Sequence, residues 1–273
     1  MGTRVFITGG ASGLGRALAQ RYARDGASVC IGDVDDAAGQ QAVEALLAEG
    51  ATAHYLHCDV TREPQLHEAA DWLRTQWGGV DIVINNAGVA QIGGITESSL
   101  EDWQWAVDIN LLGVVRGCKA FIPLLQAQGG GKLLNVASIA GLLYMPRSGG
   151  YNATKAAVIA LSETLQLELH DSGIQVSVAC PAYFRTDLAR NMRASNAQIH
   201  QLTRNLVEQA RLGPDEVAEL IHAGLARGDT HILTHPATRI AWRLKRWLPY
   251  RWYLGMVRKQ IAKAAAAAAA ATA

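Results

Sequence analysis

Seven short apolar runs recur along the chain, and longer stretches with helical periodicity separate them. The runs cover residues 5–8, 28–32, 53–57, 81–85, 132–137, 175–180 and 231–234. They show little polar alternation, which is typical of strands covered by helices on both faces. Helices are predicted over residues 14–24, 36–49, 63–77, 99–127, 149–171 and 214–227. This alternation predicts an α/β protein with a doubly wound, parallel, seven-stranded sheet in a single domain.

Composition divides the chain into three regions. Residues 1–236 contain every predicted strand, residues 237–263 form a basic aromatic extension, and residues 264–273 are an Ala-rich tail. The chain is 49% hydrophobic and 18% charged, as expected for a globular protein. Within the first region, residues 182–210 are less regular and follow the C-terminal end of a strand. Ligands bind at such ends in open α/β sheets, so this segment is a predicted lid.

The formal net charge of +1 hides an uneven distribution. Residues 239–263 hold eight of the 25 Lys and Arg residues and no Asp or Glu. The rest of the chain therefore carries 17 basic and 24 acidic residues. An acidic body repels phosphates, which argues against nucleic acid as a partner.

Cysteine and histidine spacing predicts neither a disulfide nor a metal site. The four cysteines lie far apart, form no C-x-x-C pair and fall in or beside apolar runs, so we expect buried, reduced thiols. The histidines lack the spacing of metal ligands. The first residues lack a signal-peptide core, and no apolar run is long enough to span a bilayer. These features predict a cytoplasmic location.

A glycine-rich segment, TGGASGLG at residues 8–15, joins the first strand to the first helix. Its spacing, G-x-x-x-G-x-G, differs from the common G-x-G-x-x-G dinucleotide fingerprint, and alone it fits a structural turn equally well. Its position after the first strand favours a pyrophosphate site at the start of a helix. The candidate contacts are Gly9, Ser12, Gly13, Leu14 and Gly15.

Asp33 closes the second strand about 20 residues after the glycines. A carboxylate there can accept hydrogen bonds from ribose hydroxyls and repels a 2′-phosphate. Neither Ser12 nor Val34 offers a cation to such a phosphate. NAD is therefore predicted over NADP. The alternative is that Asp33 is an acid placed before the next helix.

The sequence YNATK, residues 151–155, places a phenol and an ammonium four positions apart. In a helix the two side chains share one face. An adjacent ammonium favours phenolate and lowers the phenol pKa, so Tyr151 is predicted to act in general acid–base catalysis near neutral pH. The alternative is an ordinary amphipathic helix face.

Six motifs in register make the chain resemble the classical short-chain dehydrogenase/reductase family over about residues 3–235. They are TGGASGLG, CDVT at 58–61, NNAG at 85–88, Asn110, Ser138 thirteen positions before Tyr151, and YNATK. The resemblance implies a Rossmann-like, NAD(P)-binding oxidoreductase domain that acts on CH–OH groups and assembles as a homodimer or homotetramer. A non-catalytic nucleotide sensor or scaffold on the same fold is the alternative function.

The resemblance also implies roles for individual residues. Ser138 would bind the substrate oxygen, Lys155 would also hold the nicotinamide ribose, and Asn110 would hold a helix distortion and a water that extends the proton path. Singly, Ser138 also fits a turn and Asn110 a buried amide. The implied catalytic set is Asn110, Ser138, Tyr151 and Lys155.

Further cofactor contacts follow from the same resemblance. Asp59 and Val60 would face the adenine, and Thr186 would contact the nicotinamide amide. Ala182 stands after Pro181 where the family usually has Gly, so the loop into the lid departs from the pattern. The remaining implied cofactor contacts are Asn86, Ala87, Gly88, Tyr151, Lys155 and Pro181.

Apolar residues near the catalytic motifs predict a lipophilic alcohol or ketone as substrate. Some of them can instead pack against the scaffold or another subunit. The candidates are Leu142, Leu143, Tyr144, Met145, Tyr183 and Phe184, with Met192 in the lid.

Residues 239–263 combine their eight cations with three Trp and two Tyr residues. This composition suits a helix that lies on a membrane surface, and it equally suits a contact with another subunit. Pro249 is predicted to divide the segment into two short helices.

Overall fold

The computed structural model describes residues 2–186, 188 and 191–272 and their side chains up to residue 262. The chain forms two compact units, Met1–Thr234 and His235–Ala273. Part of the predicted lid, residues 187, 189 and 190, lies outside the described residues.

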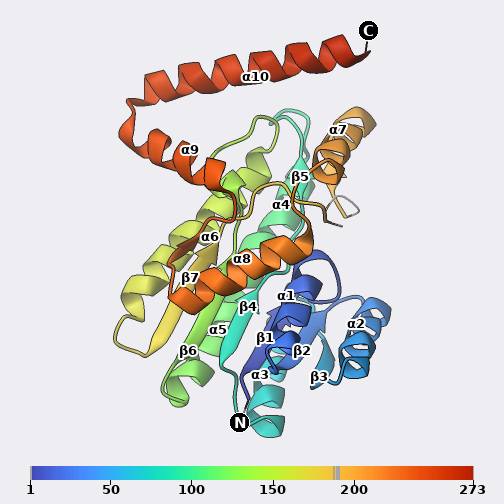
Figure 1. Cartoon of the computed structure of the whole chain (residues 1–273), viewed down its shortest axis with the longest axis vertical. Coiled ribbons are helices and arrows are strands. Elements are labelled where there is room, and N and C mark those ends of the chain that lie inside the picture. The colour runs from blue at the N-terminus through green and yellow to red at the C-terminus, as the bar shows by residue number, and fades with distance from the viewer. Residues whose placement is uncertain (1, 187, 189–190, 273) are drawn as a thin grey trace. The chain divides into compact units, whose positions relative to one another are not determined.

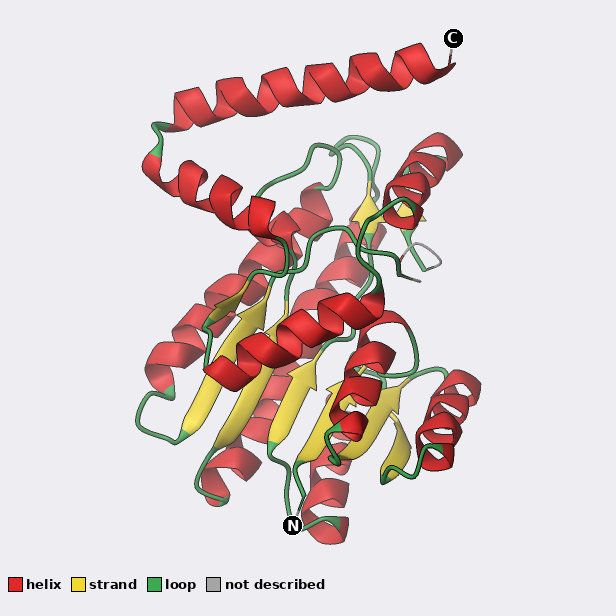
Figure 2. Ribbon diagram, viewed as in Figure 1, coloured by secondary structure: helices red, strands yellow, loops and turns green. Residues whose placement is uncertain are grey.

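The first unit contains the predicted parallel sheet of seven strands, shown in yellow in Figure 2. From edge to edge the strand order is β3-β2-β1-β4-β6-β7-β9. The chain begins with β1 near the centre, adds β2 and β3 toward one edge, and then returns to add β4, β6, β7 and β9 toward the other edge. This order confirms a doubly wound, Rossmann-like fold. The strands are β1 Arg4–Thr8, β2 Ser28–Asp33, β3 Ala53–His57, β4 Ile82–Asn85, β6 Gly131–Val136, β7 Ile174–Ala179 and β9 His231–Ile232.

Helices cover both faces of this sheet (Figure 1). The helices of the first unit are α1 Gly13–Arg24, α2 Asp36–Ala48, α3 Glu63–Gln76, α4 Leu100–Val107, α5 Gly113–Ala127, α6 Gly149–Glu168, α7 Ala197–Glu208 and α8 Pro214–Arg227. Each predicted helical stretch is present within a few residues of its expected bounds, and the one predicted over residues 99–127 is divided into α4 and α5. α7 was not predicted and lies in the segment interpreted as a lid.

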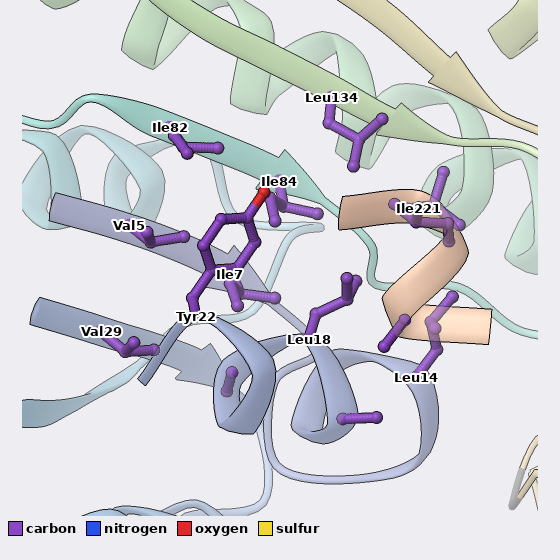
Figure 3. Packing of buried hydrophobic residues seen from close by; sticks show 14 of the residues in the cluster. Val5, Ile7, Leu14, Leu18, Tyr22, Val29, Ile82, Ile84, Leu134 and Ile221 are labelled. Atoms are coloured by element: carbon purple, nitrogen blue, oxygen red, sulfur yellow. The ribbon is translucent and has the colours of Figure 1, made fainter. Parts of the chain in front are cut away.

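Successive apolar side chains of a strand point to opposite faces of the sheet, so the core consists of two layers. Val5 and Ile7 of β1 face α1 and α8, where they pack with Leu18 and Ile221 (Figure 3). Phe6, between them, faces the opposite side and packs against Phe121 of α5, with tilted rings whose centroids are 4.8 Å apart. All these side chains are buried, and burying each large apolar side chain contributes about 1.5–3 kcal/mol. The four cysteines are also buried and free, as predicted.

Two short strands, β5 Gln91–Ile92 and β8 Arg193–Ala194, form a separate parallel pair. Their pairing ties the chain after β4 to the lid segment. α7 begins three residues after β8, and its N-cap Asn196 accepts a hydrogen bond from the amide of Ile199 at 2.9 Å. The lid segment is therefore anchored at one end by a sheet pair and a capped helix.

The second unit consists of two helices, α9 Pro236–Trp247 and α10 Tyr250–Thr272. Leu248 is extended, with φ −80° and ψ 144°. The helical conformation is disfavoured for a residue that precedes proline, so α9 ends ahead of Pro249 as predicted. The second helix is not short as expected, because α10 has 23 residues.

Candidate active site

A cleft lies at the C-terminal ends of the strands, where open α/β sheets bind ligands. Fourteen of the fifteen predicted cofactor residues line it. They are Gly9, Ser12, Gly13, Leu14, Asp33, Asp59, Val60, Asn86, Ala87, Gly88, Tyr151, Lys155, Pro181 and Thr186. Gly15 does not line the cleft and instead lies buried behind the glycine loop.

Two residues of the glycine loop adopt a backbone conformation that favours glycine. Gly9 and Gly13 have φ of 64° and 49°, a region that favours glycine. The loop is held to the second strand because the amide of Gly9 donates to the carbonyl of Gly32 at 2.7 Å. Ser12, the N-cap of α1, makes no side-chain cap, so the first N–H groups of the helix remain available to an anion. The loop therefore fits a dinucleotide.

Asp33 stands at the edge of the cleft in a fixed orientation. One carboxylate oxygen accepts from the amide of Ala11 at 3.0 Å, and the other accepts from the amide of Asp35 at 3.2 Å. The neighbouring Val34 is 58% exposed and carries no charge. A negative charge thus borders the cleft beside the glycine loop.

The NNAG segment joins the glycine loop to the sheet. Asn86 donates to the carbonyls of Thr8 and Gly9 at 2.9 and 3.0 Å, and the Thr8 hydroxyl accepts from the amides of Asn86 and Ala87. Asn85 is buried against α5 and donates to Asn135 at 2.9 Å. This segment therefore fixes the floor of the cleft and also lines it.

Asn110 lies in a π-helical turn, Asp108–Leu112, between α4 and α5. Its side chain is fully buried, accepts from the amide of Val89 at 2.8 Å and donates to the carbonyl of Val89 at 2.9 Å. It also donates to the Thr154 hydroxyl at 3.3 Å. The predicted helix distortion at Asn110 is confirmed, and these bonds attach it to the loop after β4.

Lys155 and Asn110 converge on Gly88. A Cβ added at Gly88 would lie 3.1 Å from Asn110 Oδ1 and 3.3 Å from Lys155 Nζ. Lys155 Nζ donates to the carbonyl of Val136 at 2.9 Å and lies 5.9 Å from the centroid of the Tyr151 ring. The structure thus places Tyr151 and Lys155 in the wall of the cleft, with Asn110 buried directly behind Gly88.

Burial controls the titration of this pair. It raises the pKa of Tyr151 to about 12, opposed in part by a hydrogen bond with Ser138. It lowers the pKa of Lys155 to about 8. The prediction that the phenol pKa is lowered is therefore wrong for this structure, because desolvation disfavours phenolate more than the hydrogen bond with Ser138 favours it.

Ser138 follows β6 and opens a 3₁₀ turn, Ile139–Gly141. Its hydroxyl accepts from the amide of Ala140 at 3.1 Å and donates to the carbonyl of Pro181 at 3.4 Å. Ser138 thus serves as a turn residue, as one interpretation of the sequence holds. It also lines a second pocket together with Tyr151.

This second pocket adjoins the cleft, because Tyr151, Pro181, Phe184, Thr186 and Leu188 line both. Its empty volume is about 730 Å³, open solvent included. The predicted residues Met145, Tyr183, Phe184 and Met192 line it, whereas Leu142, Leu143 and Tyr144 do not. Leu142 is buried and Tyr144 is 54% exposed outside the pocket.

Several lining residues were not predicted. Ala90 and Ile92 come from the segment around β5, and Thr203 and Val207 come from α7. Asn152 also lines the pocket, and its Nδ2 donates to the carbonyl of Met145 at 2.8 Å. The cleft residues Val136 and Ala137 were detectable, since they end a predicted strand and so follow the rule that locates ligands there.

Comparison with known proteins agrees with this geometry. A 3-alpha-(or 20-beta)-hydroxysteroid dehydrogenase of Mycobacterium bovis is 38% identical over 69% of this chain and 71% of its own. A 2,5-dichloro-2,5-cyclohexadiene-1,4-diol dehydrogenase of Sphingobium indicum is 36% identical over 70% of this chain and 76% of its own.

A solved structure extends the likeness to the whole fold. The short-chain dehydrogenase/reductase from Burkholderia phymatum, in complex with NAD, has a TM-score of 0.86 and 34% identity, and the match covers 90% of this chain and 93% of that one. The family model for short chain dehydrogenase matches residues 3–197. The chain therefore belongs to the short-chain dehydrogenase/reductase family, oxidoreductases that use a nicotinamide cofactor and act on CH–OH groups.

Proposed function

We propose that this enzyme interconverts a lipophilic secondary alcohol and its ketone with NAD, and that Tyr151 is its general acid and base. The observation that carries the proposal is the position of Tyr151 in the wall shared by the dinucleotide cleft and the apolar pocket. A group placed there reaches a substrate oxygen while the substrate carbon faces the cleft.

Each residue of the set has a distinct task. The nicotinamide, when bound, accepts hydride from the alcohol carbon or returns it to the ketone. Tyr151 exchanges the hydroxyl proton, and Ser138 donates a hydrogen bond to the same oxygen and stabilises charge that develops on it. In the ketone direction the phenol is the proton donor, for which its raised pKa is suitable, since the proton is in place at neutral pH.

In the alcohol direction Tyr151 must pass a proton onward. The ammonium of Lys155 favours the phenolate that remains, and it lies on the same face of α6. Asn110 orients the loop after β4 and, together with Lys155, borders Gly88, where a water can extend the proton path. Lys155 also holds the nicotinamide ribose in this proposal.

The lining of the second pocket supports a lipophilic substrate. Apart from Ser138 and Tyr151 the wall is mainly apolar, with Met145, Phe184 and Met192 contributing large side chains. Relatives are named for a hydroxysteroid and for a chlorinated cyclohexadiene diol, which are both alcohols on apolar rings. We therefore infer that ring-bearing secondary alcohols are the best first substrates.

The proposal is tested by a panel of alcohols and ketones assayed through the absorbance of the reduced nicotinamide. We expect turnover with hydroxysteroids or cyclic alcohols and much lower kcat/KM with short linear alcohols, because these leave the apolar wall uncovered. If the protein binds NAD and turns over no member of the panel, the nucleotide-sensing or scaffold function replaces this one.

In this proposal the carboxylate of Asp33 makes the enzyme prefer NAD to NADP. Replacing Asp33 with Ala removes the negative charge beside the ribose, and we expect the ratio of kcat/KM for NAD to that for NADP to fall about 10- to 100-fold, since like charges in contact cost several kcal/mol. The ratio is the proper measure because Asp33→Ala also removes the hydrogen bond from the Ala11 amide, and that loss weakens the binding of NAD and NADP alike.

Asp33→Glu is the matched control, because it keeps the charge and should retain the preference for NAD. An unchanged ratio in Asp33→Ala would show that another group selects the cofactor. The assembly into a homodimer or homotetramer and the cytoplasmic location stay predictions.

A further inference from the structure

The two helices of the second unit carry an apolar stripe bordered by cations. In α9, Ile240, Leu244 and Trp247 recur at intervals of four and three residues and so lie on one helix face. Their side chains are 62%, 38% and 86% exposed. We call residues 239–263 the basic aromatic segment.

The cations of α9 follow the same spacing on an adjoining face. Arg239, Arg243 and Arg246 recur at intervals of four and three residues and are exposed. Arg246 also lies over the ring of Trp242, 5.3 Å from its centroid. An apolar face thus lies next to a row of guanidinium groups.

The start of α10 repeats this arrangement. Tyr250 and Ile261 lie on one face and are 62% and 40% exposed, and Trp252 is 71% exposed on another. Arg251 and Arg258, seven residues apart, share a face beside the apolar one. Exposed aromatic and apolar side chains beside Arg residues therefore continue past the break at Pro249, on more than one face of α10.

We propose that the basic aromatic segment binds the surface of an anionic phospholipid bilayer. Its eight cations without a single acidic residue complement lipid phosphates, and its Trp and Tyr rings suit the boundary between headgroups and acyl chains. The remaining chain has 17 basic and 24 acidic residues, so such a surface attracts the segment and repels the rest.

A bilayer surface fits these side chains better than a second copy of the chain. The cores of subunit interfaces are poor in charged residues, and Lys is depleted from interfaces as a whole. Here the segment carries three Lys and five Arg residues and no acidic residue, and Arg239, Arg243 and Arg246 border the apolar stripe of α9. On a bilayer the same side chains extend to the phosphates while the stripe enters the headgroup region. Among the described residues no helix is long and apolar enough to cross a membrane.

The test measures co-sedimentation of the full-length protein with vesicles of phosphatidylcholine and phosphatidylglycerol and with vesicles of phosphatidylcholine alone. We expect binding to the anionic vesicles, weakening with added salt because exposed charges are screened over about 8 Å at physiological ionic strength. Each cation at the surface contributes about fivefold in affinity. The triple variant Arg239→Gln, Arg243→Gln, Arg246→Gln should therefore bind about 100-fold more weakly.

Matched controls separate the segment from the rest of the chain. Arg24→Gln, Arg74→Gln, Arg227→Gln makes the same change of charge at exposed positions of the first unit. Because it only makes an already acidic region more negative, it should leave vesicle affinity unchanged or slightly lower, far from the loss expected for the segment variant. Ile240→Gln with Leu244→Gln should weaken binding at least tenfold. The same change at the exposed Leu100 and Leu167 should have no effect.

Three results would overturn the proposal. The full-length protein does not bind anionic vesicles at low salt, or the triple variant binds them as well as the control does. In the third, the segment variants alter the sedimentation mass of the protein while vesicle binding is absent, which assigns the segment to a subunit contact. Dehydrogenase activity is not a readout, so failure here is distinct from failure of the proposed reaction.

Discussion

Replacing Tyr151 with Phe is expected to lower kcat by about 1000-fold and to leave the Kd for NADH within about twofold of the wild type. General acid–base catalysis by a positioned side chain contributes about 10²–10⁴-fold, and Phe removes only the group that exchanges the proton. The ring remains and continues to fill the wall between cleft and pocket. Steady-state kinetics with the best alcohol of the panel and a fluorescence titration with NADH measure the two quantities.

Tyr144→Phe is the control for this experiment. It removes the same hydroxyl from the same stretch of chain, at a residue that lies outside the pocket and is 54% exposed. We expect its kcat to stay within about threefold of the wild type, as for most surface changes. If Tyr151→Phe retained full turnover, or lost NADH binding in proportion to its rate, Tyr151 would not be the proton-exchange group.

The cleft could be located from the sequence because of one property of parallel sheets. Asp33 ends β2, and Asp59 and Asn86 come just after β3 and β4, while parallel strands bring their C-terminal ends to one edge. The distortion at Asn110 was implied by the resemblance and is a local feature of one helix. Residues fixed by strand order or local sequence were therefore predictable.

The substrate pocket required information that the sequence pattern lacks. Val207 reaches the wall from α7 and Ile92 from β5, more than 100 residues away along the chain. β5 and β8 pair through two residues each, too few to show a period. For α7 the sequence contained one signal, because Asn196 is a residue type that favours the N-cap position. The helix was nevertheless not predicted, because the sequence of α7 is mostly polar.

The pKa of Tyr151 is a second property that the sequence pattern does not predict. Spacing of four residues places Lys155 near the phenol, and that part of the prediction holds. The direction of the shift depends on desolvation, which results from the packing of the whole site. The helical spacing of Tyr151 and Lys155 thus predicts that the two side chains lie close together. Their burial, which the spacing does not predict, decides which protonation state is favoured.

Replacing Gly15 with Ala is expected to lower the free energy of unfolding by about 3 kcal/mol and to weaken NADH binding at least tenfold. An added Cβ would press against the carbonyl oxygen of Gly9 and would lie 2.6 Å from Nδ2 of Asn86. The obstacle is backbone, and Asn86 is tied to both Thr8 and Gly9, so neither can move aside without opening the floor of the cleft. Gly15 acts in this way although it does not line the cleft, because it sets how closely α1 approaches the glycine loop.

Urea denaturation and calorimetric titration with NADH measure the two effects of Gly15→Ala. Gly255→Ala provides the comparison, because a Cβ at that helical position meets no atom within 4 Å and Ala is the better helix former by about 1 kcal/mol. It should leave NADH affinity unchanged. A Gly15→Ala protein as stable as the wild type, with the same Kd for NADH, would mean that α1 can shift without disturbing the diphosphate loop, and the close approach at Gly15 would then have no part in cofactor binding.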